Sequence, residues 1–153
     1  SRDLRIVAVC LLVSAFFVYS TYANRTGVAT VLDWKRAALV GVIQGLAVLP
    51  GWSRSGSTIA MAMILGLSGP AAFRFSFLLS LPAVAGACLL ELTKDGALSG
   101  MGPEPFVGAL VAFGSGYLAL RLLRGVVSRG RFHVFAYYLV PLAAALLLLS
   151  ARP

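Results

Sequence analysis

The chain has 153 residues, of which 59% are hydrophobic and 12% are charged, and its formal net charge is +8. A soluble domain of this length has no interior large enough to bury so much apolar surface, so the composition excludes an ordinary soluble globular protein. The basic residues lie mainly in short connections between apolar runs and form no face with interleaved aromatic side chains, which argues against a nucleic-acid partner.

The first apolar run, Ile6–Tyr22, would form a helix of about one membrane thickness, at roughly 1.5 Å per residue. The next two apolar runs, Ala37–Leu49 and Ile59–Leu67, are too short to cross a bilayer comfortably, and the polar break Pro50–Thr58 separates them. Two half-length segments around a break rich in glycine and serine predict a re-entrant helical hairpin over about residues 37–67, or a broken helix. A single kinked spanning helix is the alternative.

Three longer apolar runs complete the chain and have the length of membrane spans, namely Ala71–Leu92, Phe106–Leu123 and Phe132–Ser150. A loop rich in glycine and proline joins the first two, and the basic loop Arg124–Arg131 joins the last two. The pattern predicts an all-α integral membrane protein with about four transmembrane helices and one re-entrant hairpin, in a single membrane domain over residues 1–153. The positive-inside bias places the basic loop on the cytoplasmic side.

Arg54 lies in the polar break, and neither flanking apolar run contains an acidic residue to neutralise it. Placing an arginine at membrane depth costs about 2.5–3.5 kcal/mol on insertion scales. An anionic ligand would offset this cost, and the planar guanidinium group suits the oxygens of a phosphate. The alternative is an ordinary cytoplasmic loop with one arginine that extends toward the lipid headgroups.

The residues around Arg54 fit the same ligand. Gly51 and Gly56 allow backbone amides to approach an anion closely. Hydroxyl donors occupy most of the other positions, at Ser53, Ser55, Ser57 and Thr58. One of the last two is expected to cap a helix that begins near Ile59, whose N-terminus would direct free amides and a positive dipole end at the break. Together these features predict an oxyanion site that holds a phosphate group.

The same break carries a resemblance to a known family, through the segments Gln44-Gly45, Pro50-Gly51-Trp52-Ser53-Arg54-Ser55-Gly56-Ser57-Thr58-Ile59 and Phe73-Arg74-Phe75-Ser76-Phe77-Leu78-Leu79-Ser80-Leu81-Pro82. Over nearly its whole length the chain resembles the C-terminal half of undecaprenyl-diphosphate phosphatase, the bacitracin-resistance family. The resemblance implies a multi-pass protein of the bacterial inner membrane, built from two inverted repeats that each contain a re-entrant hairpin. It also implies hydrolysis of undecaprenyl diphosphate to undecaprenyl phosphate and inorganic phosphate, which recycles the lipid carrier of cell-wall synthesis.

Carried over by position, the resemblance gives Arg54 the role of binding and stabilising the diphosphate. Ser53, Ser55 and Thr58 would act with it as hydroxyl donors in catalysis. Substrate binding would also involve the residues that shape the loop, which are Gly51, Gly56 and Ser57.

The family's first-half motif, close to E-G-x-T-E-F-L-P-x-S-S-T-G-H, is absent from this chain. In the family that motif supplies glutamates tied to divalent-metal use. A Mg²⁺ or Ca²⁺ cofactor is therefore expected with ligands from a missing N-terminal half or a second chain, as in a homodimer, and no metal ligand is expected here. Near the C-terminus, this chain has Leu139 where the family often shows arginine.

Two other functions stay open from the sequence. Broken helices that meet near the membrane midplane are also typical of transporters, so the protein would move a polyprenyl phosphate between leaflets without cleaving it. A non-catalytic binding or structural half-module is the other alternative.

Overall fold

The computed structural model describes residues 2–23, 27–93 and 104–151, and the regular secondary structure within these ranges is helical. In chain order the helices are α1 (Arg2–Ser20), α2 (Trp34–Leu46), α3 (Arg54–Ile64), α4 (Gly69–Leu92), α5 (Glu104–Ser128) and α6 (Val134–Ala151). An isolated parallel bridge joins Ala29 to Leu67. The predicted all-α class is confirmed.

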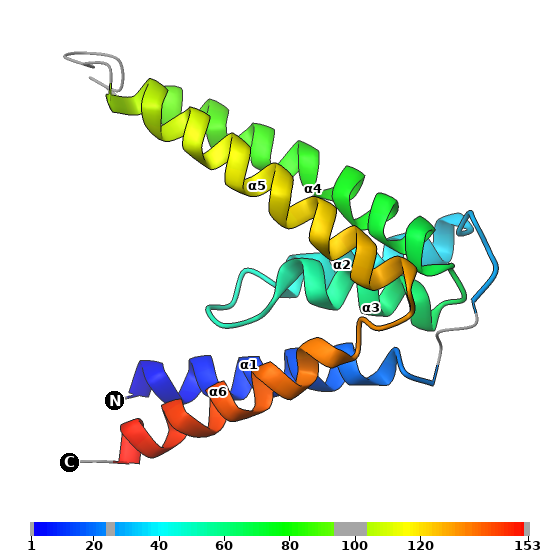
Figure 1. Ribbon diagram of the computed structural model, residues 1–153, viewed down its shortest axis with the longest axis horizontal. Coiled ribbons are helices and arrows are strands. Elements are labelled where there is room, and N and C mark those ends of the chain that lie inside the picture. The colour runs from blue at the N-terminus through cyan, green and yellow to red at the C-terminus, as the bar shows by residue number, and fades with distance from the viewer. Residues whose placement is uncertain (1, 24–26, 94–103, 152–153) are drawn as a thin grey trace.

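The helices pack in antiparallel pairs (Figure 1). α1 and α6 run side by side, and both chain termini lie at the same end of this pair. α4 and α5 form a longer pair that is inclined to the first. The short helices α2 and α3 form a hairpin between the two pairs, and α3 contacts α1, α2 and α4. The hairpin therefore occupies the position where the other helices converge.

Local interactions fix the open end of the α2–α3 hairpin, where α2 begins and α3 ends. α2 begins after Asp33, whose carboxylate accepts a hydrogen bond from the Arg36 amide at 2.8 Å. After α3 the chain turns at Gly66, which has a φ of 103°. The carbonyl oxygen of Gly66 accepts a hydrogen bond from the Ala29 amide at 3.2 Å. The segment that leads into α2 therefore lies against the segment that leaves α3.

The tip of the hairpin packs against α1. Gly51 has a φ of 87°, a conformation that favours glycine, and an added Cβ would lie 2.6 Å from the carbonyl oxygen of Val7. The ring of the next residue, Trp52, lies 6.1 Å from that of Phe17, centroid to centroid. A side chain at Gly51 would therefore push the tip away from α1.

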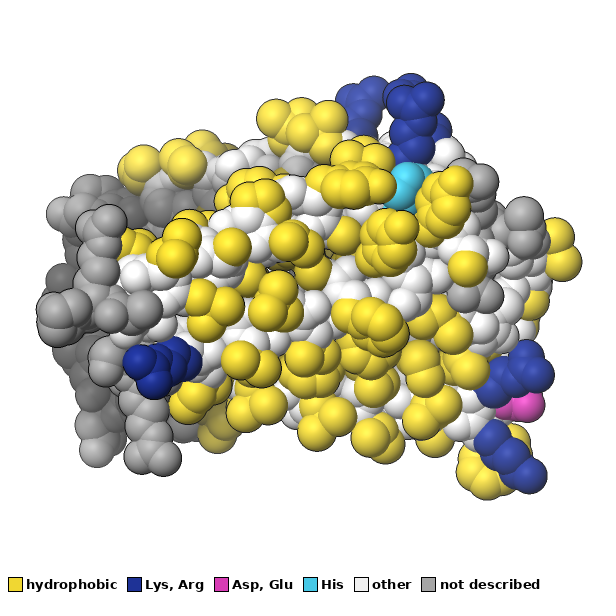
Figure 2. Space-filling model, turned by 90° about the horizontal axis from the view of Figure 1, so that it is seen from below, with side chains coloured by type: hydrophobic (Ala, Val, Ile, Leu, Met, Phe, Trp, Pro, Cys, Tyr) yellow, Lys and Arg dark blue, Asp and Glu magenta, His cyan; other side chains and the backbone are white. Residues whose placement is uncertain are grey.

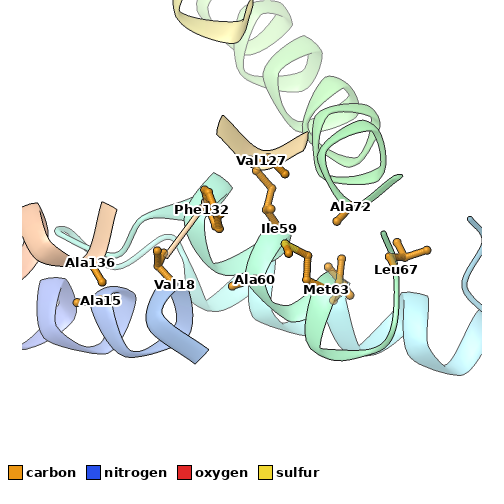
Figure 3. Close-up of a cluster of buried hydrophobic side chains, with 12 residues drawn as sticks. Ala15, Val18, Ile59, Ala60, Met63, Leu67, Ala72, Val127, Phe132 and Ala136 are labelled. Carbon is orange, nitrogen blue, oxygen red and sulfur yellow. The ribbon is translucent and has the colours of Figure 1, made fainter. Parts of the chain in front are cut away.

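The core of the molecule is centred on α3 (Figure 3). Ile59 and Met63 of α3 are only 1% and 2% exposed. Around them lie Val18 of α1, Val127 of α5 and Phe132, which precedes α6. α3 thus holds the apolar contacts that join the two long helix pairs, and burial of its side chains supplies the main stabilisation of this region.

α4 and α5 are the helices best suited to a membrane. Both are long and apolar enough to cross one by length and composition, over Gly69–Leu92 and Pro105–Ser128. Only 6% and 0% of their most apolar stretches are buried, whereas the core helix of a soluble protein is mostly buried. Their apolar side chains need lipid or another polypeptide to cover them. α1 and α6 contain shorter apolar stretches, Leu4–Ser20 and Val134–Ser150.

Hydrophobic side chains cover most of the described surface seen in Figure 2, while lysine and arginine side chains gather mainly toward one end. That end carries the open end of the α2–α3 hairpin and the turn between α5 and α6. The exposed basic residues of these segments are Lys35, Arg36, Arg124, Arg129 and Arg131. A basic end on an apolar helical protein is the distribution expected for a cytoplasmic side.

The predicted end of the apolar helix over Phe106–Leu123 is wrong. α5 continues through Arg124 to Ser128, so the loop expected over Arg124–Arg131 begins only after the helix has ended. Arg124 interrupts the apolar pattern, but it is exposed, and arginine is a good helix former. The number of membrane spans, the re-entrant hairpin and the single membrane domain stay predictions. Most of the predicted loop between α4 and α5, residues 94–103, lies outside the described residues.

Candidate anion-binding site

α3 begins at Arg54, earlier than the sequence predicted, and Ser53 is its N-cap. Ser53 Oγ accepts a hydrogen bond from the Gly56 amide at 3.2 Å. The predicted cap at Ser57 or Thr58 is wrong, because both hydroxyls lie inside the helix and donate to carbonyl oxygens four residues earlier, at 2.7 and 2.8 Å. The helix start therefore lies within the polar break and not after it.

A buried serine of α1 holds this helix start in place. The Ser53 amide donates to Ser14 Oγ at 2.8 Å, and Ser14 is fully buried. Gly56 is needed beside the cap, since an added Cβ would lie 2.6 Å from Ser53 Oγ. The cap accepts from the Gly56 amide, whereas the amides of Arg54 and Ser55 have no acceptor within the helix. The fixed helix start therefore directs these N–H groups and a positive dipole end at the polar break.

Arg54 lines a cavity of about 210 Å³ between α3, α4 and α5. The hydroxyl-bearing residues of its wall are Ser55, Thr58, Ser76 and Ser80, and the remaining lining is apolar. Arg54 Nη2 is buried without a hydrogen-bond partner, and no carboxylate of the described residues forms an ion pair with Arg54. A buried charged donor without a partner is costly, and Arg54 is the cationic residue of this cavity wall, so an anion bound to its side chain would offset that cost.

One hydroxyl contact in this cavity joins α3 to α4. Thr58 Oγ1 and Ser76 Oγ lie 2.5 Å apart, and both residues are buried. Sequence reasoning misses Ser76, although it stands in the motif that carries the resemblance. In the sequence, Ser76 is marked only as a hydroxyl residue in an otherwise apolar run. This position does not show in which direction its side chain points.

The structure separates the predicted site residues into two groups. Arg54, Ser55 and Thr58 line the cavity. Ser57 does not line it; this residue is fully buried, and its hydroxyl donates to the Ser53 carbonyl oxygen. Gly51 lies at the hairpin tip, where it shapes the turn against α1. The cavity therefore brings together the cation and a subset of the predicted hydroxyls.

A second cavity, of about 540 Å³, adjoins the first. Ser53, Ser55 and Gly56 line it beside the start of α3, and apolar side chains of α5 and α6, including Leu139, form most of the rest. Ser55 and Leu123 line both cavities, so a cationic space and an apolar space are direct neighbours.

The residues around Arg54 do not suit a divalent cation. Mg²⁺ and Ca²⁺ prefer carboxylate and carbonyl oxygens, whereas this cavity offers a guanidinium group and hydroxyls. In the part of the chain that the structure describes, no group of three His, Cys, Asp or Glu residues is placed to hold a metal ion. The described lining of this cavity therefore gives no basis for a reaction step through a metal ion.

The fold and the cavity define an all-helical protein with an apolar exterior and a cationic cavity at the start of a short buried helix. A family model described as bacitracin resistance protein BacA matches residues 1–145. The chain belongs to this family, whose members are membrane proteins.

Curated relatives named undecaprenyl-diphosphatase align with nearly all of the chain. The chain is 43% identical to the protein from Korarchaeum cryptofilum over 143 residues, which are 94% of this chain and 54% of the relative. It is 38% identical to the protein from Methanosphaera stadtmanae, over 97% of this chain and 55% of the relative. It is 42% identical to that from Desulfosudis oleivorans, over 98% and 56%. The chain thus spans about half the length of these relatives. No solved structure matches it significantly.

Proposed function

We propose that the chain forms part of a membrane phosphatase that hydrolyses undecaprenyl diphosphate to undecaprenyl phosphate and inorganic phosphate. The name shared by the curated relatives supports this activity and favours hydrolysis over transport. The observation that carries the proposal is the buried Nη2 of Arg54, which has no partner among the described residues and belongs to a residue that lines a hydroxyl-bearing cavity.

In the overall reaction, the bond between the terminal phosphorus and the bridging oxygen breaks, and the lipid phosphate leaves with the electron pair. The phosphoryl group ends on the oxygen of a water molecule as inorganic phosphate, and that water gives up one proton. The phosphoryl and bridging oxygens carry the negative charge of the transition state. Arg54 stabilises that charge by donating to these oxygens, and Ser55 adds a hydroxyl donor. The dipole of α3 acts in the same direction, and the apolar wall of the cavity strengthens each of these interactions.

The neighbouring apolar cavity fits the other end of the same substrate. An amphiphile whose phosphates contact Arg54 would extend its isoprenoid chain past Ser55 and Leu123, the residues that line both cavities. A lipid diphosphate therefore accounts for the cationic and the apolar space together, whereas a soluble phosphate ester accounts only for the first.

The proposal places the protein in the bacterial plasma membrane as a multi-pass protein. α4 and α5 would supply two spans, and α1 and α6 would bring the total to about four. The α2–α3 hairpin would be re-entrant, because the start of α2 and the end of α3 both lie at the basic end of the molecule and the chain turns back at Gly51. The basic end would then face the cytoplasm.

The chain would supply the anion-binding part of the active site as one half of an inverted-repeat protein. The nucleophile and the ligands of a Mg²⁺ or Ca²⁺ ion would come from an N-terminal half or from a second chain, as in a homodimer. The greater length of the curated relatives supports the first arrangement, since about 54–56% of each aligns with this chain.

Phosphate release by the full-length gene product, purified in detergent and supplied with undecaprenyl diphosphate, tests the proposal. We expect Arg54→Ala to lower turnover by about 10²–10³-fold, the scale seen when one donor to a transition-state oxyanion is removed. Arg54→Lys should recover part of the loss, because it keeps the charge and loses the planar fork. Arg129→Ala, at an exposed arginine outside the cavity, is the matched control. Equal turnover in Arg54→Ala and Arg129→Ala would remove the role assigned to Arg54.

A further inference from the structure

Ser76 differs from other serines of the long helices in its hydrogen bond. Ser80 and Ser115 donate to carbonyl oxygens of their own helices at 2.7 and 2.8 Å, as serine commonly does inside a helix. Ser76 instead contacts Thr58 of α3, and it is only 5% exposed. Its hydroxyl is therefore directed toward the neighbouring helix, at the wall of the Arg54 cavity.

The Thr58 and Ser76 hydroxyls have two possible arrangements of their protons. Thr58 has one hydroxyl proton. The carbonyl oxygens of Arg54 and Ser55, at 2.8 and 3.3 Å, and Ser76 Oγ, at 2.5 Å, lie within reach of it. When Thr58 donates to a carbonyl oxygen, Ser76 must donate to Thr58. When Thr58 donates to Ser76, the Ser76 proton is released to donate elsewhere. The Arg54 carbonyl oxygen keeps a partner in both arrangements, since the backbone amide of Thr58 bonds to it within the helix.

We propose that this pair is a hydroxyl switch through which Ser76 binds the phosphate held by Arg54. In the empty cavity, Ser76 donates to Thr58. A phosphate oxygen beside Arg54 draws the Ser76 proton toward itself, and Thr58 turns to donate to Ser76. The phosphate gains one donor, and neither hydroxyl is left unpaired in either state.

The inference deepens the proposed function and rests on it, since the phosphate in question is that of the lipid diphosphate. The phosphate would then be held from two helices, by Arg54 of α3 and by Ser76 of α4. A hydrogen bond from a hydroxyl to a charged oxygen is stronger than one between neutral groups, so the loss of Ser76 should appear mainly in substrate affinity.

The test uses the full-length gene product in detergent, with undecaprenyl diphosphate as substrate and inorganic pyrophosphate as a competing anion. We expect Ser76→Ala to raise both KM and the pyrophosphate inhibition constant by about ten- to a hundredfold. Ser76→Thr keeps the hydroxyl and should restore most of the affinity. Ser115→Ala removes a helical hydroxyl outside the cavity and should match the wild-type protein.

Each outcome either supports the switch or overturns it. If pyrophosphate inhibits the Ser76→Ala and Ser115→Ala variants equally, the switch is overturned. The proposed function still stands if Arg54→Ala loses turnover in the same assay. Weaker binding that Ser76→Thr does not restore, together with a lower melting temperature, assigns Ser76 a structural role and also overturns it.

A wild-type protein that releases no phosphate contradicts the proposed function and not the switch. Calorimetric titration with pyrophosphate then decides the inference directly. Tighter binding by wild type and Ser76→Thr than by Ser76→Ala supports the switch, whereas equal affinity, or no binding by the wild-type protein, overturns it.

Discussion

The Ser53 amide and the Ser14 hydroxyl form a 2.8 Å hydrogen bond that ties the start of α3 to α1. Arg54 is the next residue. The contact between Ser53 and α1 therefore fixes the backbone position from which the Arg54 side chain extends. Ser76 of α4 contacts α3 through Thr58. The short helix that carries the candidate site is thus held by serine hydroxyls from two neighbouring helices, and the position of the cavity depends on how those helices pack.

Ser14→Ala should destabilise the protein by about 1–2 kcal/mol, because the Ser53 amide loses its acceptor in a partly buried position. Turnover should fall without being abolished, since the guanidinium group of Arg54 remains but its helix start is less constrained. Thermal unfolding in detergent and phosphate release measure the two effects. Ser115→Ala, which removes a hydroxyl that bonds within its own helix, should change stability by no more than about 0.5 kcal/mol. Equal stability of the two variants would show that Ser14 does not hold the helix start.

Gly51→Ala and Gly66→Ala form a matched pair that tests the packing of the hairpin tip. Both glycines have positive φ, but an added Cβ meets the Val7 carbonyl oxygen only at Gly51 and meets open space at Gly66. Gly66→Ala should cost about 1–2 kcal/mol from backbone strain alone. Gly51→Ala should cost about 3 kcal/mol or more, since overpacking adds to the strain. A similar shift of the melting temperature in both would mean that the tip does not rest on α1.

Helix existence could be predicted from this sequence better than helix boundaries. The long apolar runs led directly to α4 and α6, and both helices continue through an internal proline, Pro82 and Pro141. The start of α3 was predicted at the wrong residue, since Ser53, Ser57 and Thr58 are all acceptable caps by residue type. Ser53 is the cap in the structure, and its amide also donates to Ser14 of α1. No pattern in the neighbouring sequence indicates this contact.

The same reason divides the candidate site into predictable and unpredictable parts. Arg54 stood out because a charge in an apolar context needs an explanation in any fold. Ser76 could not be identified, because its role depends on a contact with Thr58 across a separation of 18 residues and between two helices. Gly51 was expected to shape the loop, and it has a positive φ at the hairpin tip, but its neighbour Val7 belongs to another helix and is known only from the fold.

Gly56→Ala should weaken the start of α3, although alanine is normally the better helix former. The added Cβ would lie 2.6 Å from Ser53 Oγ, so the cap must shift or break. We expect a net destabilisation of about 1–3 kcal/mol and a loss of turnover, because Arg54 would move with the cap. Gly41→Ala is the control in α2, where an added Cβ meets nothing within 4 Å. It should leave stability unchanged or raise it by up to about 1 kcal/mol. A Gly56→Ala variant as stable and active as Gly41→Ala would show that the cap tolerates a side chain.

Gln44 joins α2 to α4, and its two amide atoms have opposite energetic effects. Nε2 donates to the Leu79 carbonyl oxygen at 3.2 Å, whereas Oε1 is buried without a partner among the described residues. The bond contributes about 0.5–1.5 kcal/mol, and the unpaired oxygen costs about 1–3 kcal/mol. Gln44→Leu should therefore leave the melting temperature of this chain unchanged or raise it, since leucine has a similar volume and no polar atom. In the full-length gene product, a marked destabilisation by the same substitution would contradict this reading of Oε1. It would mean that the amide has a partner in a part of the protein beyond the described residues.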